Sequence, residues 1–215
     1  TCPLVTKVHK EVARRQKQNH QVILIGHSGH PEVEGTLGQS NDSKKITLIE
    51  SISDIDELNF SDTIGISYTT QTTLSVDDTK QIVDTLKTKF PQIQAPKKSD
   101  ICYATQNRQD SVKSMINNSE MLLVIGSKNS SNSNRLREIA ENNDKPAYLI
   151  DGANDIDEKW MIGINSIGVT AGASAPELLV QEVVGYLLEN GADEIIEVTG
   201  ANESVHFPVP ATLGV

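Results

Sequence analysis

Apolar and polar residues follow two alternating rhythms along the chain, and together they predict repeated strands and helices. Short apolar runs of strand length end in small or polar residues, and between them apolar residues recur at helical spacing. Strands are expected at residues 21–26, 45–50, 62–68, 121–125, 147–151, 166–170 and 194–198. Such alternation is typical of an α/β fold whose mostly parallel sheets are flanked by helices.

The helices between these runs are expected to present one apolar face to the sheets. The first begins at Pro3, a residue suited to a first helical turn, and Ser75 is placed to cap another that runs to about residue 90. Further helices are expected at 53–58, after 102, from 135, before 160 and over 177–190. In the last of these, the predicted core residues are Leu178, Leu179, Val183, Val184 and Leu187.

The stretch 91–99 is the best candidate for a linker, because it contains two prolines and two lysines between helical patterns. It predicts two small α/β domains, 1–95 and 96–200. The tail 201–215 carries scattered apolar residues but no domain of its own. We expect it to pack on structure that this chain does not contain.

Composition and charge argue against some classes of function. The net charge of −10 and the pI of about 4.9 argue against a nucleic-acid partner, which requires a basic face. No apolar run has the length of a membrane span, so no membrane partner and a cytoplasmic location are expected. The two cysteines lie a hundred residues apart, and we expect no disulfide between them.

A polar turn after the apolar run 121–125 is the first candidate for chemistry. Strand, polar turn and helix place backbone N–H groups at a helix N-terminus, where an anion is stabilised. Ser130, Ser131 and Asn132 are best placed to add hydrogen bonds there. One serine would be explained as a cap, but the six consecutive Ser and Asn residues of 129–134 exceed what a cap requires. The pattern predicts a phosphate-type site.

Two further strand ends carry reactive side chains. Residues 27–35 form an expected loop with two histidines, among them His30, and two carboxylates, among them Glu32. Residues 69–75 form a hydroxyl-rich turn that includes Thr72 and Thr73. Singly, such residues are most often solvated surface groups or caps. Because open α/β sheets bind ligands at the carboxyl ends of their strands, the group at 27–35 is interpreted as a proton-handling site.

Cys2 and Cys102 each stand directly before an expected helix. A helix N-terminus favours negative charge, which suits a thiolate that binds a metal. The alternative for each cysteine is a small buried apolar residue.

Six strings place these residues in a recognisable order. They are TCPLVTKVH, GHPEVEGTLGQ, TQTTLSVDDT, DICYATQNRQ, GSKNSSNSNRL and GVTAGASAP, and they span nearly the whole chain. In these strings the chain resembles the 4-hydroxy-3-methylbut-2-enyl diphosphate reductase family, the last enzyme of the non-mevalonate isoprenoid pathway.

The resemblance implies a role for each candidate residue. Cys2 and Cys102 would be two of three thiolate ligands of a [4Fe–4S] cluster. Glu32 would donate a proton together with Thr72, and His30 would bind substrate and help deliver the proton. The diphosphate would be held by Ser130, Ser131, Asn132 and Ser174, with Thr73 as an adjacent supporting residue.

The resemblance also implies a reaction and an incomplete chain. The family removes an allylic hydroxyl reductively, giving isopentenyl and dimethylallyl diphosphates with electrons from a ferredoxin or flavodoxin. Its fold comprises three pseudo-equivalent α/β domains, and the first carries the third cysteine and two more histidines. This sequence begins within the second cysteine motif. We therefore expect two of the three domains, no activity from this chain alone, and an opening helix that comes from the junction with the first domain.

Two other hypotheses fit part of the pattern. A non-enzymatic α/β module that binds a phosphorylated small molecule would use Ser130, Ser131, Asn132 and Ser174 but gives no role to Cys2, Glu32 or Thr72. Alternatively, two chains could hold one cluster between them at a dimer interface.

Overall fold

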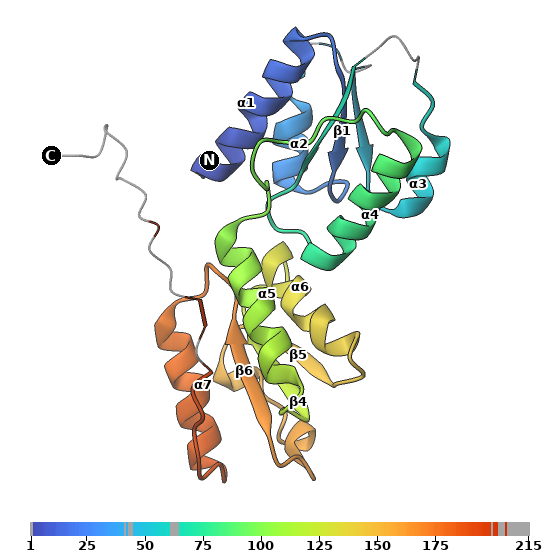
Figure 1. Cartoon of the computed structure of the whole chain (residues 1–215). Coiled ribbons are helices and arrows are strands. Elements are labelled where there is room, and N and C mark those ends of the chain that lie inside the picture. The colour runs from blue at the N-terminus through green and yellow to red at the C-terminus, as the bar shows by residue number, and fades with distance from the viewer. Residues whose placement is uncertain are drawn as a thin grey trace, which may run out of the picture.

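The structure is a computed structural model that describes residues 2–40, 42, 45–60, 65–198, 200, 201 and 205. It shows two lobes, each built around a three-stranded parallel sheet (Figure 1). The first sheet has the order β2-β1-β3, and the second has the order β5-β4-β6. The strands are β1 (Gln21–Ile25), β2 (Ile46–Ile49), β3 (Ile66–Thr70), β4 (Met121–Ile125), β5 (Ala147–Ile150) and β6 (Ile167–Ala171). The α/β prediction is confirmed.

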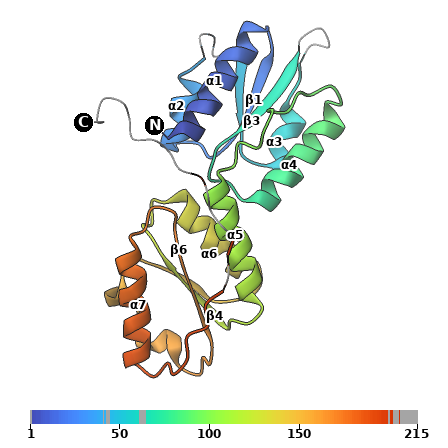
Figure 2. The same cartoon turned by 60° about the vertical axis from the view of Figure 1, so that its left-hand side comes forward.

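Helices cover both faces of each sheet, as Figures 1 and 2 show. In the first lobe, α1 (Pro3–Lys17) and α2 (Pro31–Leu37) lie on one face, and α3 (Ile52–Glu57) and α4 (Val76–Lys89) lie on the other. In the second lobe, α5 (Tyr103–Ile116) and α6 (Ser131–Glu141) lie opposite α7 (Glu177–Glu189). Two short 3-10 helices, η2 (Ala153–Asp155) and η3 (Glu158–Met161), follow β5 in place of the single short helix expected there.

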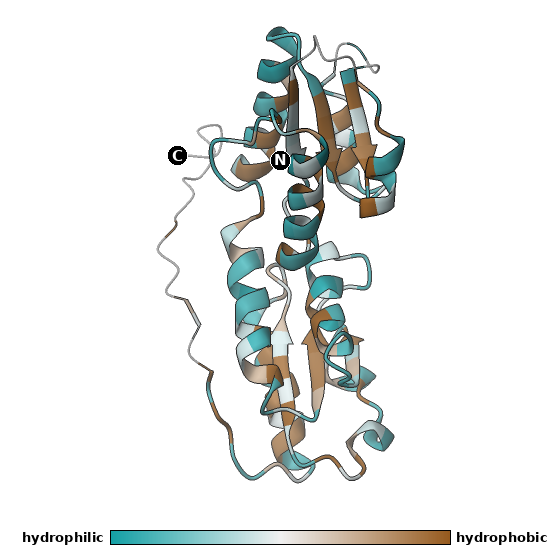
Figure 3. Ribbon diagram, turned by 45° about the vertical axis from the view of Figure 1, so that its right-hand side comes forward, coloured by the Kyte–Doolittle hydropathy of each residue, from teal (hydrophilic) through white to brown (hydrophobic). Residues whose placement is uncertain are grey.

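The central strands are buried on both faces, because successive side chains of a strand point to opposite sides. From β1, Ile23 and Ile25 pack with α3 and α4, whereas Val22 and Leu24 pack with α1 and α2. Strand β4 alternates in the same way between α7 and the pair α5 and α6. Figure 3 shows the resulting distribution, with apolar residues concentrated on the strands and polar residues on the outward faces of the helices. Each lobe therefore has a core on both sides of its sheet.

The strand order places a crevice at the same point in each lobe. The chain passes from β1 to β2 on one side and then crosses to β3 on the other, so the loops after β1 and β3 diverge. In parallel open sheets, ligands bind outside the carboxyl ends of strands at such a switch point. The second lobe repeats the arrangement with β4 and β6.

Two expected loops prove to be partly helical. Residues 27–35 contain the start of α2, because Pro31 occupies its first turn and the His30 side chain caps it. Helix α6 begins at Ser131, whereas the apolar rhythm predicted a start at Arg135, because Ser130 caps the Ser133 amide. The polar side chains of 131–134 therefore lie in a first helical turn.

Three expectations near strand and helix ends are wrong. Residues 194–198 form no strand, and Ile195 and Ile196 are exposed. Leu178, predicted to lie in the core, is 63% exposed because its position in the first turn of α7 faces away from the sheet. The third strand runs over 66–70 and not 62–68; residues 61–64 lie outside the described part, as do most residues of the tail 201–215.

The segment 91–99 is attached to the first sheet. The Gln94 amide donates to the Ile66 carbonyl at 2.9 Å, and the Tyr68 amide donates to the Gln94 carbonyl at 3.1 Å. The segment thus runs along the edge of β3 before it enters the second lobe. The domain boundaries of 1–95 and 96–200 stay a prediction. Among the described residues, no helix has both the length and the apolar character needed to cross a membrane.

Candidate active site

A carboxyl group and a threonine meet across the crevice of the first lobe. Glu32 lies in the first turn of α2, and Thr72 follows β3. The Thr72 amide donates to Glu32 Oε1 at 2.8 Å, and the Thr72 hydroxyl donates to Glu32 Oε2 at 3.0 Å. Glu32 and Thr72, which the resemblance expects to act together, are therefore in direct contact. The other carboxylate of the stretch, Glu34, is exposed.

The pKa of Glu32 is raised above its ordinary value. Burial is the main cause, because it disfavours the charged carboxylate, and the negative charge of Asp100 acts in the same direction. The two hydrogen bonds from Thr72 lower the pKa and offset part of this effect. A carboxyl with a raised pKa beside a hydroxyl has the properties of a general acid.

His30 lies beside this pair as the cap of α2. Its Nδ1 accepts a hydrogen bond from the Glu32 backbone amide at 3.2 Å, so a neutral ring carries its proton on Nε2. Burial lowers the pKa of His30, and the neighbouring His27 lowers it further. His30 is thereby held as a neutral side chain that can donate a hydrogen bond from Nε2.

The two cysteines occupy matching positions. Cys2 is the N-cap of α1 and Cys102 is the N-cap of α5, and both are free thiols. The Cys102 amide donates to the Thr72 carbonyl at 2.8 Å, so the Cys102 backbone is held next to the Glu32–Thr72 pair. Helix α1 leads into β1 and packs along it, which places Cys2 at the same edge of the sheet. No disulfide joins Cys2 and Cys102 in the described structure.

This donor set fits part of an iron–sulfur site. Both thiols lie at helix N-termini, and neither side chain makes a capping hydrogen bond within the described structure. Such thiols suit an anionic group that binds sulfur ligands. Within the described ranges, no group of three or more His, Cys, Asp or Glu side chains is arranged to bind a metal ion. A [4Fe–4S] cluster takes three or four cysteine ligands, so further ligands would have to come from beyond these residues.

The predicted phosphate-type residues surround the start of α6. Ser130 Oγ caps the helix by accepting from the Ser133 amide at 3.2 Å. Gly126 and Gly172 lie close to Ser133, and a Cβ at either glycine would collide with its side chain. These two glycines bring the ends of β4 and β6 against the first turn of α6. The backbone amides of that turn therefore lie at the second crevice.

Asn132 provides the clearest sign of a ligand. The residue is 5% exposed, and within the described structure neither Nδ2 nor Oδ1 has a hydrogen-bond partner. A buried primary amide without partners is costly, by about 1–3 kcal/mol per group. An oxyanion with its hydration would satisfy the amide group. Ser174 is exposed on the neighbouring loop, two residues after Gly172.

Hydroxyl groups connect the two crevices. The Thr73 hydroxyl donates to Ser131 Oγ at 3.0 Å, and Ser131 Oγ lies 3.3 Å from the Thr73 carbonyl oxygen. Gln71 Nε2 donates to the Thr73 hydroxyl at 2.9 Å. The carboxyl edges of both sheets thus face one site between the lobes. The functional roles of all these residues stay predictions.

A separate pocket of about 320 Å³ lies near the end of β1 on the side of α4. It is lined by His27, Ser75, Arg135 and others, but by none of the residues predicted to act in catalysis, cluster binding or diphosphate binding. We therefore place the candidate site at the junction of the two crevices and not in this pocket.

Two buried residues of the site were not predicted from the sequence. Gln71 is 1% exposed and also accepts a hydrogen bond from the His27 amide at 3.0 Å. Asp100 is 3% exposed and accepts from the Thr69 hydroxyl and the Thr70 amide. Each stands in a string that carried the family resemblance, but their partners lie in other elements, and sequence spacing alone does not reveal such pairs.

The fold and the site define an α/β protein with an enzyme-type centre at the carboxyl edges of two parallel sheets. The model of the LytB protein family matches residues 1–188. A 4-hydroxy-3-methylbut-2-enyl diphosphate reductase of Ruthia magnifica subsp. Calyptogena magnifica is 68% identical over 213 residues, covering 99% of this chain and 69% of the relative. The reductase of the same name from Yersinia pestis bv. Antiqua is 56% identical over 216 residues, covering 100% and 68%. The chain belongs to the LytB family, a family of reductases, and the resemblance drawn from the motifs is confirmed.

Solved structures agree with this assignment. The structure of the E-1-hydroxy-2-methyl-but-2-enyl-4-diphosphate reductase from Plasmodium falciparum superposes with a TM-score of 0.84 at 39% identity, covering 87% of this chain and 58% of that one. A second reductase structure, described as the terminal enzyme of the non-mevalonate pathway, has a TM-score of 0.53 at 31% identity and is covered to 66%. The chain therefore corresponds to about three fifths to two thirds of the length of its relatives.

Proposed function

We propose that this chain supplies the acid, the diphosphate-binding residues and two cluster ligands of a 4-hydroxy-3-methylbut-2-enyl diphosphate reductase. The reaction is the reductive removal of the allylic hydroxyl of (E)-4-hydroxy-3-methylbut-2-enyl diphosphate, which gives isopentenyl and dimethylallyl diphosphates. The observation that carries the proposal is the Glu32–Thr72 pair, a half-buried carboxyl with a raised pKa that is hydrogen-bonded to Thr72, whose carbonyl accepts from the Cys102 amide.

Glu32 is the proton donor in this proposal. A hydroxyl leaves as water only when it gains a proton, and the raised pKa keeps the Glu32 carboxyl protonated to a higher pH than an exposed glutamate. The Thr72 hydroxyl is oriented by Glu32 Oε2 at 3.0 Å, so it can pass a proton between that carboxyl and a substrate oxygen. His30 orients the substrate through Nε2, the nitrogen left free by its capping bond.

The diphosphate binds at the start of α6. Backbone amides at a helix N-terminus and neutral hydroxyl donors stabilise a phosphate without a fixed positive charge. Asn132 gains there the hydrogen bonds that its buried amide lacks. Ser130, Ser131 and Ser174 add hydroxyls, and Thr73 supports Ser131 from the first lobe.

Cys2 and Cys102 would hold the [4Fe–4S] cluster, which supplies electrons and a Lewis-acidic iron when it is bound. The third cysteine ligand would come from the part of the family's length that this chain does not cover. A ferredoxin or flavodoxin in the cytoplasm would deliver the two electrons. In this proposal the chain alone is inactive.

The test replaces Glu32 by Gln in the complete protein, with Glu34→Gln as the matched control on the same helix. Gln can still accept from the Thr72 amide but has no acidic proton, so turnover is expected to fall by about a hundredfold or more while substrate binding is retained. Glu34→Gln is expected to leave turnover unchanged, because Glu34 is exposed. Equal activities of the two variants would contradict the proposal and favour a binding module without chemistry.

A further inference from the structure

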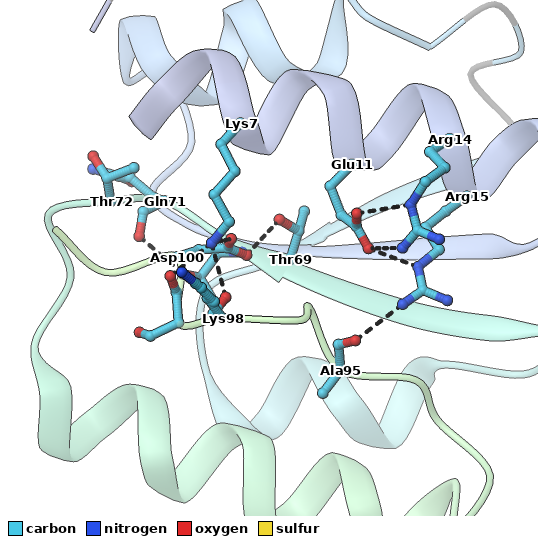
Figure 4. Close-up of polar contacts among 12 residues, drawn as sticks. Lys7, Glu11, Arg14, Arg15, Thr69, Gln71, Thr72, Ala95, Lys98 and Asp100 are labelled. Carbon is cyan, nitrogen blue, oxygen red and sulfur yellow. Dashed lines mark hydrogen bonds and ion pairs between the residues drawn. The ribbon is translucent and has the colours of Figure 1, made fainter. Parts of the chain in front are cut away.

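The charged side chain of Lys7 connects α1, which begins after Cys2, to the segment that leads to Cys102. Lys7 lies in the second turn of α1, the helix that Cys2 caps, and Asp100 stands two residues before Cys102. Lys7 Nζ lies 3.0 Å from Asp100 Oδ1 and donates to the carbonyls of Lys98 at 2.8 Å and Ser99 at 2.7 Å. Figure 4 shows Lys7 reaching from α1 across to this segment.

Asp100 carries the connection onward to the sheet. Its other oxygen, Oδ2, accepts from the Thr69 hydroxyl at 2.7 Å and from the Thr70 amide at 3.2 Å. Both partners belong to the carboxyl end of β3, directly before the turn that holds Thr72. The Asp100 side chain is completely buried, whereas that of Lys7 is 34% exposed. One carboxylate thus joins α1, β3 and the segment that enters α5.

We propose that Lys7 and Asp100 form a tether that fixes the position of Cys2 relative to Cys102, and that both are positioning residues for the two thiols. The inference rests on the proposed function, because it gives the thiol spacing its purpose. A cluster requires its sulfur ligands at fixed positions, and residues behind the ligands commonly hold them there. The two cysteines lie on separate elements, and no disulfide joins them.

A second attachment of α1 to the same segment lies away from the cysteines. Arg15 lies about two turns further along α1 and holds the same segment at its other end, through Gln94 and through the Ala95 carbonyl at 3.0 Å. Arg15 therefore attaches α1 to the segment far from the thiols. Lys7 acts at the end where both thiols lie, so its loss is expected to free Cys2 while α1 stays attached.

The test measures the distance between nitroxide labels on the two native thiols of this chain, by dipolar electron paramagnetic resonance. The chain contains two cysteines, so no background thiol interferes. The unsubstituted chain is expected to give one narrow distance distribution. In Lys7→Met the distribution is expected to broaden and move to longer distance. Lys10→Met removes the same charge from an exposed position of α1 and is expected to change nothing.

A double variant separates positioning from stability. Lys7→Met leaves the buried Asp100 charge without its partner, which destabilises the fold. Adding Asp100→Asn removes that charge and keeps an acceptor for Thr69 and Thr70, so the melting temperature is expected to recover while the distance distribution stays broad. If the double variant recovers both the melting temperature and the narrow distance distribution, the Lys7–Asp100 pair is purely structural and the proposal is overturned. A narrow distribution in Lys7→Met, or a broad one in the unsubstituted chain, would overturn it as well.

The measurements distinguish a failure of the tether from a failure of the proposed function. If the complete protein binds no iron–sulfur cluster although the label distances behave as expected, the reductase proposal fails and the tether remains. If the cluster forms and the Lys7→Met distances are unchanged, the tether fails and the reductase proposal remains.

Discussion

Burial of the Glu32 carboxyl raises its pKa and lowers the stability of the folded protein near neutral pH. Its folded-state pKa lies above its ordinary value, mainly because the carboxyl is buried. The folded protein therefore binds this proton more tightly than the unfolded chain does. Stability falls as the pH rises from the ordinary pKa of a glutamate through the raised folded value, and the full penalty is present above that window.

Glu32→Gln is accordingly expected to stabilise the protein near neutral pH, because a neutral amide replaces a buried carboxyl that would otherwise ionise. The gain in melting temperature should shrink as the pH is lowered through the raised pKa. Thermal unfolding of the Glu32→Gln variant and the unsubstituted protein, at acidic and neutral pH, measures this gain in melting temperature. A gain of the same size at every pH would show that ionisation of Glu32 is not its cause.

The candidate site residues could be named from the sequence, but their contacts could not. Family strings marked Glu32, Thr72 and Cys102, because each motif is contiguous in sequence. The attachment of Asp100 to Lys7 joins residues 93 positions apart and depends on how α1 packs beside β3. Patterns of spacing describe one element at a time, so such pairs appear only in the folded chain.

At the scale of elements, two serines cap helices, and only one of them is proposed to bind the diphosphate. Ser75 caps α4 through the Asp78 amide at 3.2 Å, and Ser130 caps α6 through the Ser133 amide at the same distance. Ser75→Ala and Ser130→Ala are each expected to lower the free energy of unfolding by about 0.5–2 kcal/mol. Denaturant unfolding measures both values.

Only Ser130→Ala should also weaken binding of the diphosphate substrate to the complete protein, by about 10- to 150-fold, because a hydrogen bond to a charged group is removed. Calorimetric titration with substrate or product distinguishes the two variants. Equal affinities would show that Ser130 is a cap and nothing more.

The close approach around Ser133 makes a second prediction about elements. A Cβ at Gly126 would collide with Ser133, so Gly126→Ala is expected to destabilise the second lobe by about 1–3 kcal/mol. Gly185 lies in the interior of α7 with nothing within 4 Å of a Cβ. Gly185→Ala is expected to stabilise by about 0.5–1 kcal/mol. Opposite signs in denaturant unfolding would confirm the packing of β4 against α6, and equal signs would contradict it.

The order of elements followed from the sequence, but several boundaries did not. Strands β1, β4 and β5 lie within about one residue of the apolar runs that predicted them. Helix α6 begins before its apolar rhythm does, because Ser130 caps it, and α2 forms within the expected loop 27–35, because His30 caps it and Pro31 lies in its first turn. The apolar stretch 194–198 has strand-like composition, but it pairs with no sheet, and pairing is what makes a strand.

At the scale of the whole molecule, a buried glutamine of α5 hydrogen-bonds to the first lobe. Gln109 is 1% exposed, donates to the Leu74 carbonyl at 2.8 Å and accepts from the Val76 amide at 2.9 Å. Gln109→Leu leaves these backbone groups without partners and is expected to destabilise by about 1–3 kcal/mol. Gln106→Leu, at an exposed position of α5, is the control.

The same substitution tests the junction between the lobes. Gln109→Leu should widen the distribution of lobe arrangements, which small-angle X-ray scattering detects as a larger radius of gyration. An unchanged scattering profile, with the loss of stability present, would show that the remaining contacts, among them Thr73–Ser131 and the Lys113–Asp77 ion pair at 2.7 Å, suffice to hold the junction.

The central claim is that Cys2 and Cys102 hold a [4Fe–4S] cluster beside the acid Glu32. The most direct measurement is Mössbauer spectroscopy after anaerobic reconstitution of the complete protein and its variants Cys2→Ser and Cys102→Ser with iron and sulfide. The account predicts a fully occupied [4Fe–4S] cluster in the unsubstituted protein and marked loss of it in each variant. Undiminished cluster content in either variant would contradict the account, because that cysteine would then not be a ligand.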